Sequence, residues 1–400
     1  MNVNLRHFFA LVDIADAGRL SSAAERASVS QSAMTQALRK LEELAGEPLF
    51  NRVGFGVAET PAGEALIWRA RRAIDLLRST ERELRGERPR DAGSLRRQIT
   101  ASQFRAVVAI VETGGYSTAA RRLGLAQPTI HRAAKDLEAL VGVDLFPRTP
   151  RGVEPSDVAK SLARCANLVF AEVRQGFEEV WQLQGRSDSL IAIGSLPLVR
   201  SEFLPTAITR LLSLYPDARV SILDGPYVEQ LHALRFGEID WLIGALREPS
   251  PASDVVQEPL FVQPLAVVVR PGHPLLSKPS PKIDDLAKLE WIAPRPLTPA
   301  RRFFDEFFEN NGAKTPNRII ECSSLVTTRG LLRQSDRAAL LSPMQVREDV
   351  SAGELVVLVD AIPQSSRTIG MTTRDNWKPT MVQSAFSNIV RGIASGLVAR

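Results

Sequence analysis

The feature that most constrains this chain is an internal repeat. When the sequence is shifted by 96 positions, residues 8–60 align with residues 104–156 without a gap, and 20 of the 53 aligned positions are identical. Chance would give only a few identities over this length. Because both copies must fold into the same unit, the repeat decides the architecture of the N-terminal part. We therefore expect one small module to occur twice.

Each copy has the residue pattern of a helix-turn-helix. A first helix with apolar residues at helical spacing ends at Gly18 or Gly114. A short second helix and a turn of three or four residues follow, and a third helix begins at Gln31 or Gln127. Two helices around such a turn place the second of them in the major groove of DNA. The alternative, ordinary helical hairpins with solvated faces, explains one copy more easily than two.

A wing follows the third helix in each copy. The segments LFNRVGFGV and LFPRTPRGV combine two short strands with a Gly- or Pro-containing turn, and they carry Arg52 in copy one and Arg148 and Arg151 in copy two. Arginine in a wing suits contact with phosphates or the minor groove. We therefore predict two winged helix-turn-helix modules.

The exposed positions of the third helices are the candidate base-reading residues. Glutamine can pair with adenine through two hydrogen bonds, and arginine with guanine. The candidates are Gln31, Ser32, Thr35, Gln36 and Arg39 in copy one, and Gln127, Pro128, Thr129, His131, Arg132 and Lys135 in copy two. The two helices share the first glutamine and differ at most later exposed positions, so we expect them to read different sequences.

These modules resemble the DNA-binding domain of LysR-type transcriptional regulators. The resemblance is carried by GRLSSAAERASVSQSAMTQALRKLEELAGEPLFNR with TPAG in copy one, and by GGYSTAARRLGLAQPTIHRAAKDLEALVGVDLFPR in copy two. Members of this family normally have one such domain. Copy two also lacks the TPAG ending and has Ala126 where copy one has the cap Ser30. We expect copy one to supply much of the DNA affinity and copy two to be coupled mechanically to the effector.

A long helix follows each wing. The apolar stripes of 61–85 and 157–184 indicate that each helix packs against a partner helix. In the resembled family this helix pairs antiparallel with its twin from a second chain. Here the two helices could also pair within one chain, and the sequence leaves both arrangements open. The polar segment Gly86–Gln98 is interpreted as a linker.

From Leu190 onward, short apolar runs alternate with helical stretches, which predicts an α/β fold with parallel sheet. The phrases RFGEIDWLIGALR and VVVRPGHPL resemble the two-lobed effector domain of the family, which is similar to periplasmic solute-binding proteins, and more narrowly its galactose-binding-protein regulator branch. The predicted fold class is mixed, with helical winged modules followed by a two-lobed α/β domain. The predicted divisions are 1–62 and 99–156 for the modules, 63–98 and 157–186 for the long helices, and 187–400 for the effector domain.

The resemblance places a small-molecule effector between the two lobes. The candidate contacts are Ser195, Leu196, Pro197 and Arg200 on one side, and Thr298, Ser323 and Ser324 on the other. Hydroxyl groups at helix N-termini are anion sites, which favours an organic acid or sugar-derived acid. The simpler alternative is that these serines only cap helices and that Arg200 is a solvated surface charge.

Composition narrows the remaining function classes. The net charge of +5 permits an anionic partner without requiring one. We expect no signal peptide, no membrane segment, no cofactor and no metal site, because neither the four histidines nor the two cysteines have ligand spacing. No catalytic motif indicates an enzyme. The prediction is a cytoplasmic, nucleoid-associated transcriptional regulator.

The expected partners are double-stranded promoter DNA, a small-molecule effector and further copies of the chain in a homodimer or homotetramer, with RNA polymerase as a candidate partner. One alternative is a DNA-binding protein whose C-terminal domain only oligomerises and binds no ligand. A solute-binding protein is a third class, which the repeat and the missing export signal disfavour.

Overall fold

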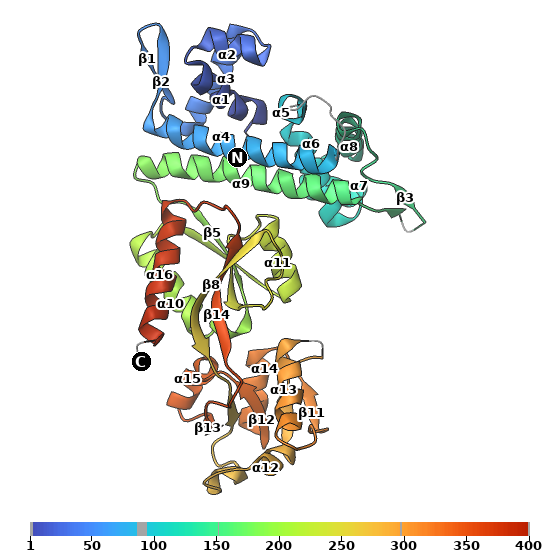
Figure 1. The fold of residues 1–400 in the computed structure, drawn as a ribbon, viewed down its shortest axis with the longest axis vertical. Helices are drawn as coiled ribbons and strands as arrows, with labels where there is room; N and C mark the ends of the chain where they lie inside the picture. The colour runs from blue at the N-terminus through green and yellow to red at the C-terminus, as the bar shows by residue number, and fades with distance from the viewer. Residues whose placement is uncertain (1–2, 86–93, 151, 297, 399–400) are drawn as a thin grey trace.

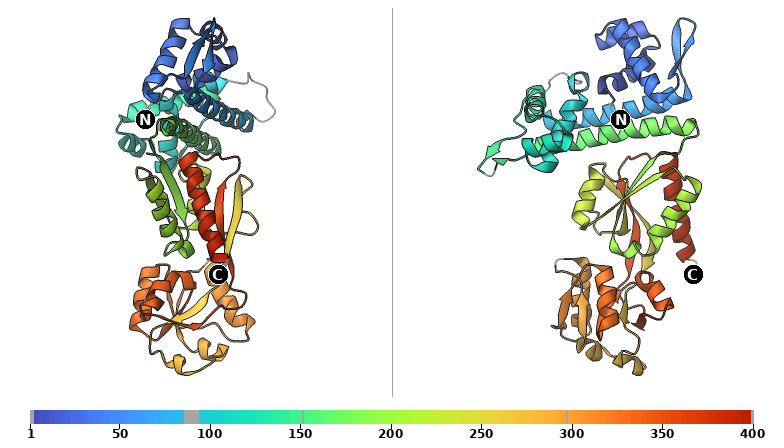
Figure 2. Two further views of the ribbon diagram at one scale, coloured as in Figure 1. Left: turned by 90° about the vertical axis from the view of Figure 1, so that its left-hand side faces the viewer. Right: turned by 180° about the vertical axis from the view of Figure 1, so that it is seen from behind.

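A computed structural model describes residues 3–85, 94–150, 152–296 and 298–398. Two small helical modules lie on a pair of long helices, and a two-lobed α/β domain extends from the other side of that pair (Figure 1). The views in Figure 2 show the same succession of modules, helix pair, first lobe and second lobe. The predicted fold class is confirmed.

Both modules have the predicted order of elements. The first contains α1 (Leu5–Ala17), α2 (Leu20–Ala27), α3 (Gln31–Ala45), β1 (Phe50–Val53) and β2 (Gly56–Glu59). The second contains α6 (Ala101–Thr113), α7 (Tyr116–Leu123), α8 (Gln127–Val141), β3 (Arg148–Thr149) and β4 (Gly152–Val153). The turn between the paired helices needs a left-handed residue, which is Ser28 with φ 55° in copy one and Gly124 with φ 66° in copy two.

The two long helices pair with each other inside the chain. Helix α4 (Pro61–Arg85) lies along α9 (Asp157–Leu183), as both figures show. The helices run antiparallel, because Arg69 near the start of α4 bonds Glu179 near the end of α9, whereas Thr80 near the end of α4 bonds Cys165. Their apolar stripes form one continuous core with both modules. The question left open by the sequence is therefore decided in favour of pairing within the chain.

The predicted linker ends in a short helix that the sequence analysis did not predict. Residues Ser94–Gln98 form the short helix α5, and Leu95 is buried while its backbone N–H donates to Glu81 Oε1 at 2.7 Å. The pattern of polar residues concealed this helix because a single apolar side chain anchors it. Residues 86–93 lie outside the described part.

Lobe 1 is a five-stranded sheet in the order β6–β5–β7–β14–β8. Its strands are β5 (Leu190–Ser195), β6 (Arg219–Asp224), β7 (Trp241–Ala245), β8 (Val255–Gln263) and β14 (Arg367–Arg374). Helices α10 (Phe203–Leu214) and α16 (Met381–Val398) cover one face, and α11 (Tyr227–Arg235) covers the other. Alternate residues of β5 enter the two cores, as a strand buried on both faces requires.

Lobe 2 repeats this plan with the sheet order β11–β10–β12–β9–β13. Its strands are β9 (Ala266–Val269), β10 (Glu290–Ala293), β11 (Ile319–Glu321), β12 (Arg337–Leu341) and β13 (Val356–Val359). Its helices are α12 (Ile283–Ala287), α13 (Pro299–Asn310), α14 (Leu325–Gln334) and α15 (Pro343–Ser351). The chain crosses between the lobes twice, before β9 and again before β14.

The expectation of a parallel sheet is only half correct. In lobe 1, β6, β5 and β7 are parallel, but β14 runs antiparallel between β7 and β8. In lobe 2, β11, β10 and β12 are parallel, but β9 runs antiparallel between β12 and β13. The two crossings explain these reversed strands. Strand β9 is the first strand after the chain crosses into lobe 2, and β14 is the first strand after it returns to lobe 1. Among the described residues no helix is long and apolar enough to cross a membrane.

The two cysteines differ sharply in accessibility. Cys165 is buried in the helix pair, and burial raises the pKa of its thiol to about 12. Cys322 follows β11 and is only half-buried. We expect a disulfide reagent at pH 8 to modify Cys322 in the folded chain and Cys165 only after unfolding, because the thiolate is the reactive form. Mass spectrometry of the labelled peptides measures this, and equal labelling of both thiols in the folded chain would contradict it.

Candidate DNA-reading surface and effector site

The predicted reading residues of copy one share one face of α3. Apolar residues on the opposite side hold the helix in the core of the module: Met34, Ala37, Leu38 and Leu41. All five candidates are exposed: Gln31, Ser32, Thr35, Gln36 and Arg39. Thr35 donates its hydroxyl to the carbonyl of Gln31 at 2.9 Å, and Arg39 pairs with Glu43 at 3.0 Å on the surface. An exposed pair of this kind is worth little, so Arg39 can exchange it for another acceptor.

The corresponding face of α8 is exposed as well. It presents Gln127, Pro128, Thr129, His131, Arg132 and Lys135. Three of these side chains already have partners in their own module. Gln127 accepts from the Ser117 hydroxyl at 2.9 Å, the His131 ring lies 5.1 Å from the ring of Tyr116, and Lys135 pairs with Glu138 at 2.6 Å. Base contacts by this helix would compete with these interactions.

The two modules also differ at the helix start and in the wing. Ser30 accepts a hydrogen bond from Ala33 N at 3.1 Å, whereas Ala126 gives α8 no side-chain cap, as the sequence predicted. A missing cap of this kind costs about 1 kcal/mol. The first wing pairs four residues in each strand and presents Arg52 to solvent, whereas the second pairs only two. Arg148 begins β3, and Arg151 lies outside the described residues.

On the lobe 1 side, the predicted effector loop follows β5. Ser195 is buried, and its hydroxyl and carbonyl oxygens both accept from the Arg200 guanidinium. Leu196 is also buried, and Pro197 begins a short 3-10 helix, η1 (Pro197–Val199). Burial lowers the pKa of Arg200, and its nearest carboxylate is Asp224 at 3.7 Å. Arg200 therefore orders the loop rather than extending into solvent.

On the lobe 2 side, two of the predicted hydroxyls cap helices. Thr298 caps α13 by accepting from Arg301 N at 3.2 Å, and Ser324 caps α14 by accepting from Thr327 N at 3.3 Å. Ser323 precedes this cap and is exposed. Both helix starts lie beyond the carboxyl ends of β10 and β11, which are neighbours in the sheet. Helix α15, which follows β12, packs against η1, so these strand ends of the two lobes face each other.

Sequence reasoning missed two arginines at this junction. Arg247 follows β7, and its guanidinium lies 4.3 Å from the centre of the Tyr227 ring. Arg367 begins β14 and lies 4.8 Å from the ring of Phe303 in lobe 2. Burial lowers the pKa of both, and for Arg247 the positive charge of Arg367 lowers it further. The buried Tyr227 hydroxyl makes no hydrogen bond within the described residues. An arginine directly after an apolar strand was the available clue.

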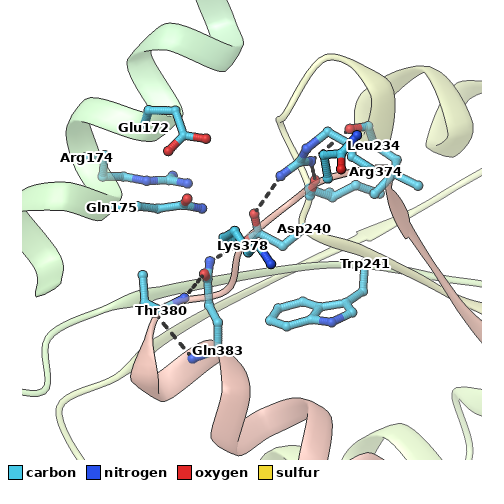
Figure 3. Close-up of polar contacts among 12 residues, drawn as sticks. Glu172, Arg174, Gln175, Leu234, Asp240, Trp241, Arg374, Lys378, Thr380 and Gln383 are labelled. Carbon is cyan, nitrogen blue, oxygen red and sulfur yellow. Dashed lines mark hydrogen bonds and ion pairs between the residues drawn. The ribbon is translucent and has the colours of Figure 1, made fainter. Parts of the chain in front are cut away.

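A buried polar layer joins the helix pair to lobe 1 (Figure 3). Asp240 accepts from Arg374 Nη2 at 3.3 Å and from Gln383 Nε2 at 2.9 Å. From α9, Glu172, Arg174 and Gln175 face the lobe in the same view. Glu178 of this helix accepts from the backbone N–H of Leu190 at 3.3 Å. The described residues contain no group of three or more potential metal ligands.

Comparison with known families gives this geometry a name. The bacterial LysR-family helix-turn-helix matches twice, at residues 5–64 and 101–160, and the LysR substrate binding domain matches residues 184–393. The chain belongs to the LysR family. It is a DNA-binding transcriptional regulator with an effector-binding domain, and not an enzyme.

Individual LysR regulators agree with this assignment. The regulator GalR of Pseudomonas putida is 34% identical over 93% of this chain and 92% of that protein. GbpR of Rhizobium radiobacter is 27% identical over 60% of this chain and 80% of that protein. Among solved structures, full-length OxyR from Pseudomonas aeruginosa shares the fold, with a TM-score of 0.56 and 23% identity over 74% of this chain and 95% of that chain.

Glu178 gives the polar layer of this LysR regulator a pH dependence. Its pKa is raised from 4.5 to about 7, mainly by burial and to a smaller extent by the charge of Asp240. Arg174, the Leu190 N–H and Arg69 act in the opposite direction. Between these two values the folded chain keeps a proton that the unfolded chain has lost, so stability falls as the pH rises through this window. We expect Glu178→Gln to raise the melting temperature more at pH 8 than at pH 5. Differential scanning fluorimetry measures both, and an equal shift at the two pH values would contradict the assignment.

Proposed function

We propose that one chain of this regulator supplies both DNA-reading modules for one asymmetric operator. The observation that carries the proposal is the antiparallel pairing of α4 with α9, which brings both modules onto one helix pair. In the family such a pair is made by two identical chains, which suits symmetric half-sites. Here α3 and α8 present different side chains, so the two half-sites should differ in sequence.

Two contrasts support a larger contribution from the first module. Its reading helix α3 has a side-chain cap, and its wing has the longer paired strands. Specific contacts by exposed arginine and glutamine would add to the phosphate contacts that position the modules. A solved relative, CbnR, has been captured with its target DNA, with a TM-score of 0.52 and 18% identity to this chain.

We expect the double variant Gln31→Ala with Arg39→Ala to lose protection of one half-site, because each bidentate base contact is worth about 1–3 kcal/mol. The variant Gln127→Ala with Arg132→Ala should lose the other half-site, with a smaller fall in affinity. Footprinting of the full chain on the promoter region of its own gene measures both effects. Arg210→Ala, which removes an exposed positive charge from α10 in lobe 1, is the control.

Two outcomes would reject the proposal that each module reads its own half-site. If either double variant loses both half-sites equally, or if the two half-sites prove identical in sequence, the operator is not read asymmetrically.

We further propose that the effector is a small organic anion bound at the lobe junction. Arg247 and Arg367 carry the argument, because two half-buried guanidinium groups lie near each other and Arg247 has no carboxylate bonded to it in the described chain. Each would be stabilised by a carboxylate, which accepts two parallel hydrogen bonds from arginine. The Tyr227 hydroxyl can donate a further bond, and the loop around Ser195 and the helix starts at Thr298 and Ser324 would enclose the ligand.

We expect small mono- and dicarboxylic acids, but not neutral sugars, to raise the melting temperature of the full chain, because binding stabilises the folded state. The double variant Arg247→Ala with Arg367→Ala should lose this shift, whereas Arg210→Ala should keep it. If no acid stabilises the chain and operator binding is unchanged by every acid, the C-terminal domain is an unresponsive oligomerisation scaffold. Stabilisation by neutral sugars alone would also reject the proposal.

A further inference from the structure

Two arginines of α4 donate hydrogen bonds to the backbone of lobe 1. Arg69 Nη2 donates to the carbonyl of Lys378 at 3.1 Å, and Arg72 Nη2 donates to the carbonyl of Asn376 at 2.8 Å. Both carbonyls lie in the loop between β14 and α16. Asn376 has a φ of 56°, a left-handed conformation that costs energy for residues other than glycine. The loop is therefore held in one shape that presents its carbonyls to α4.

The same arginines hold α9. Arg69 donates to Glu172 at 3.0 Å, to Gln175 at 2.9 Å and to Glu179 at 3.1 Å, and Arg72 donates to Glu172 at 2.9 Å. The Arg69 side chain has 0% exposure. A fully buried guanidinium is stable only while its donors are satisfied. A shift of the loop relative to α4 would leave a buried donor unpaired, so the helix pair and the loop must move together.

The loop follows β14, a strand whose other end lies at the lobe junction. Strand β14 begins at Arg367, beside Phe303 of lobe 2, and ends at Arg374, which donates to the carbonyl of Leu234 at 2.8 Å and bonds Asp240. Its eight residues span roughly 25 Å at about 3.4 Å per residue. Because β14 is hydrogen-bonded on both sides, to β7 and to β8, we expect its two ends to move together with the sheet of lobe 1.

We propose that Arg69 and Arg72 are positioning residues that couple the first DNA-reading module to the effector junction through β14. The inference rests on the proposed function and extends it by naming the route. It also revises the expectation that the second module alone is coupled to the effector. Helix α9 leads directly into lobe 1, but the cations that bond the loop after β14 belong to α4, the helix that follows the first module.

The route can be tested without knowing the effector, because coupling between two sites is reciprocal. DNA bound to the first module should change hydrogen exchange in residues 367–380. The probe is the promoter fragment that the full chain protects in a footprint. Arg72→Ala is the main variant, because its side chain is partly exposed and its loss should leave the chain folded. Arg72→Lys keeps the charge. Arg78→Ala removes an exposed arginine of the same helix, whose ion pair within the described residues is with Asp75, three positions away.

In the wild type and in Arg78→Ala we expect DNA binding to alter exchange in residues 367–380. In Arg72→Ala that change should fall at least twofold, while the Kd for the fragment changes less than threefold, and Arg72→Lys should restore part of it. A DNA-induced change that is equal in Arg72→Ala and the wild type would overturn the proposal. So would a wild type that binds the fragment with no change in this segment. A wild type that fails to bind its promoter region would instead overturn the proposed function.

Discussion

The antiparallel contact of α4 with α9 is the constraint on which the rest of this molecule depends. Each helix carries an apolar stripe too long to be covered by its own small module, and each stripe is buried by the other helix. At Gly176 the two helices approach so closely that a Cβ atom would lie 3.0 Å from Leu66 Cδ2. One chain thereby contains a helix pair that LysR regulators make from two chains.

Joining two modules in one chain permits them to diverge. In a dimer of identical chains, a substitution in the reading helix is present in both modules and therefore affects the recognition of both half-sites. Here Ala126 can replace a cap serine and the second wing can shorten while the first module keeps both features. The second module remains well packed, with Phe104, Ile130 and Leu137 buried, so its changes affect the DNA-facing side and not its core. This division is what an asymmetric operator would require.

The buried charges show how the helix pair is fixed to the effector domain. Arg69 and Arg72 bond carboxylates of α9 and carbonyls of lobe 1. Arg164 of α9 pairs with Asp254 of lobe 1, whose carbonyl accepts from Asp375 N beside the same loop. Apolar packing alone would let the pair slide over lobe 1, because apolar contacts have little directionality. Buried hydrogen-bonded charges permit one alignment, since every other alignment leaves a charge without a partner.

The secondary structure was predictable to the extent that it is local. Periodicity gave the two long helices within one residue of their ends and placed Gln31 and Arg39 on an exposed face. In the effector domain, apolar runs predict strands at 190–194, 220–223, 241–246, 265–269, 338–341 and 368–372. They do not predict β8, β10, β11 and β13. The short strands of lobe 2 gain their stability from neighbours distant in sequence, and β8 mixes polar and apolar residues as an edge strand. The α5 helix, anchored by Leu95, was missed for a similar reason.

The order of residues along the chain is enough to show that one module occurs twice, that each copy exposes a different reading face, and that each is followed by a helix needing a partner. Repeats, helical periodicity and family motifs are properties of neighbouring residues and can be read along the chain. The packed fold was needed to show which helix is that partner, that the charge of Arg367 lowers the pKa of Arg247, and that Arg69 bonds Lys378. These contacts join residues far apart in sequence. An apolar stripe or a lone arginine has many energetically similar partners until the whole chain is packed.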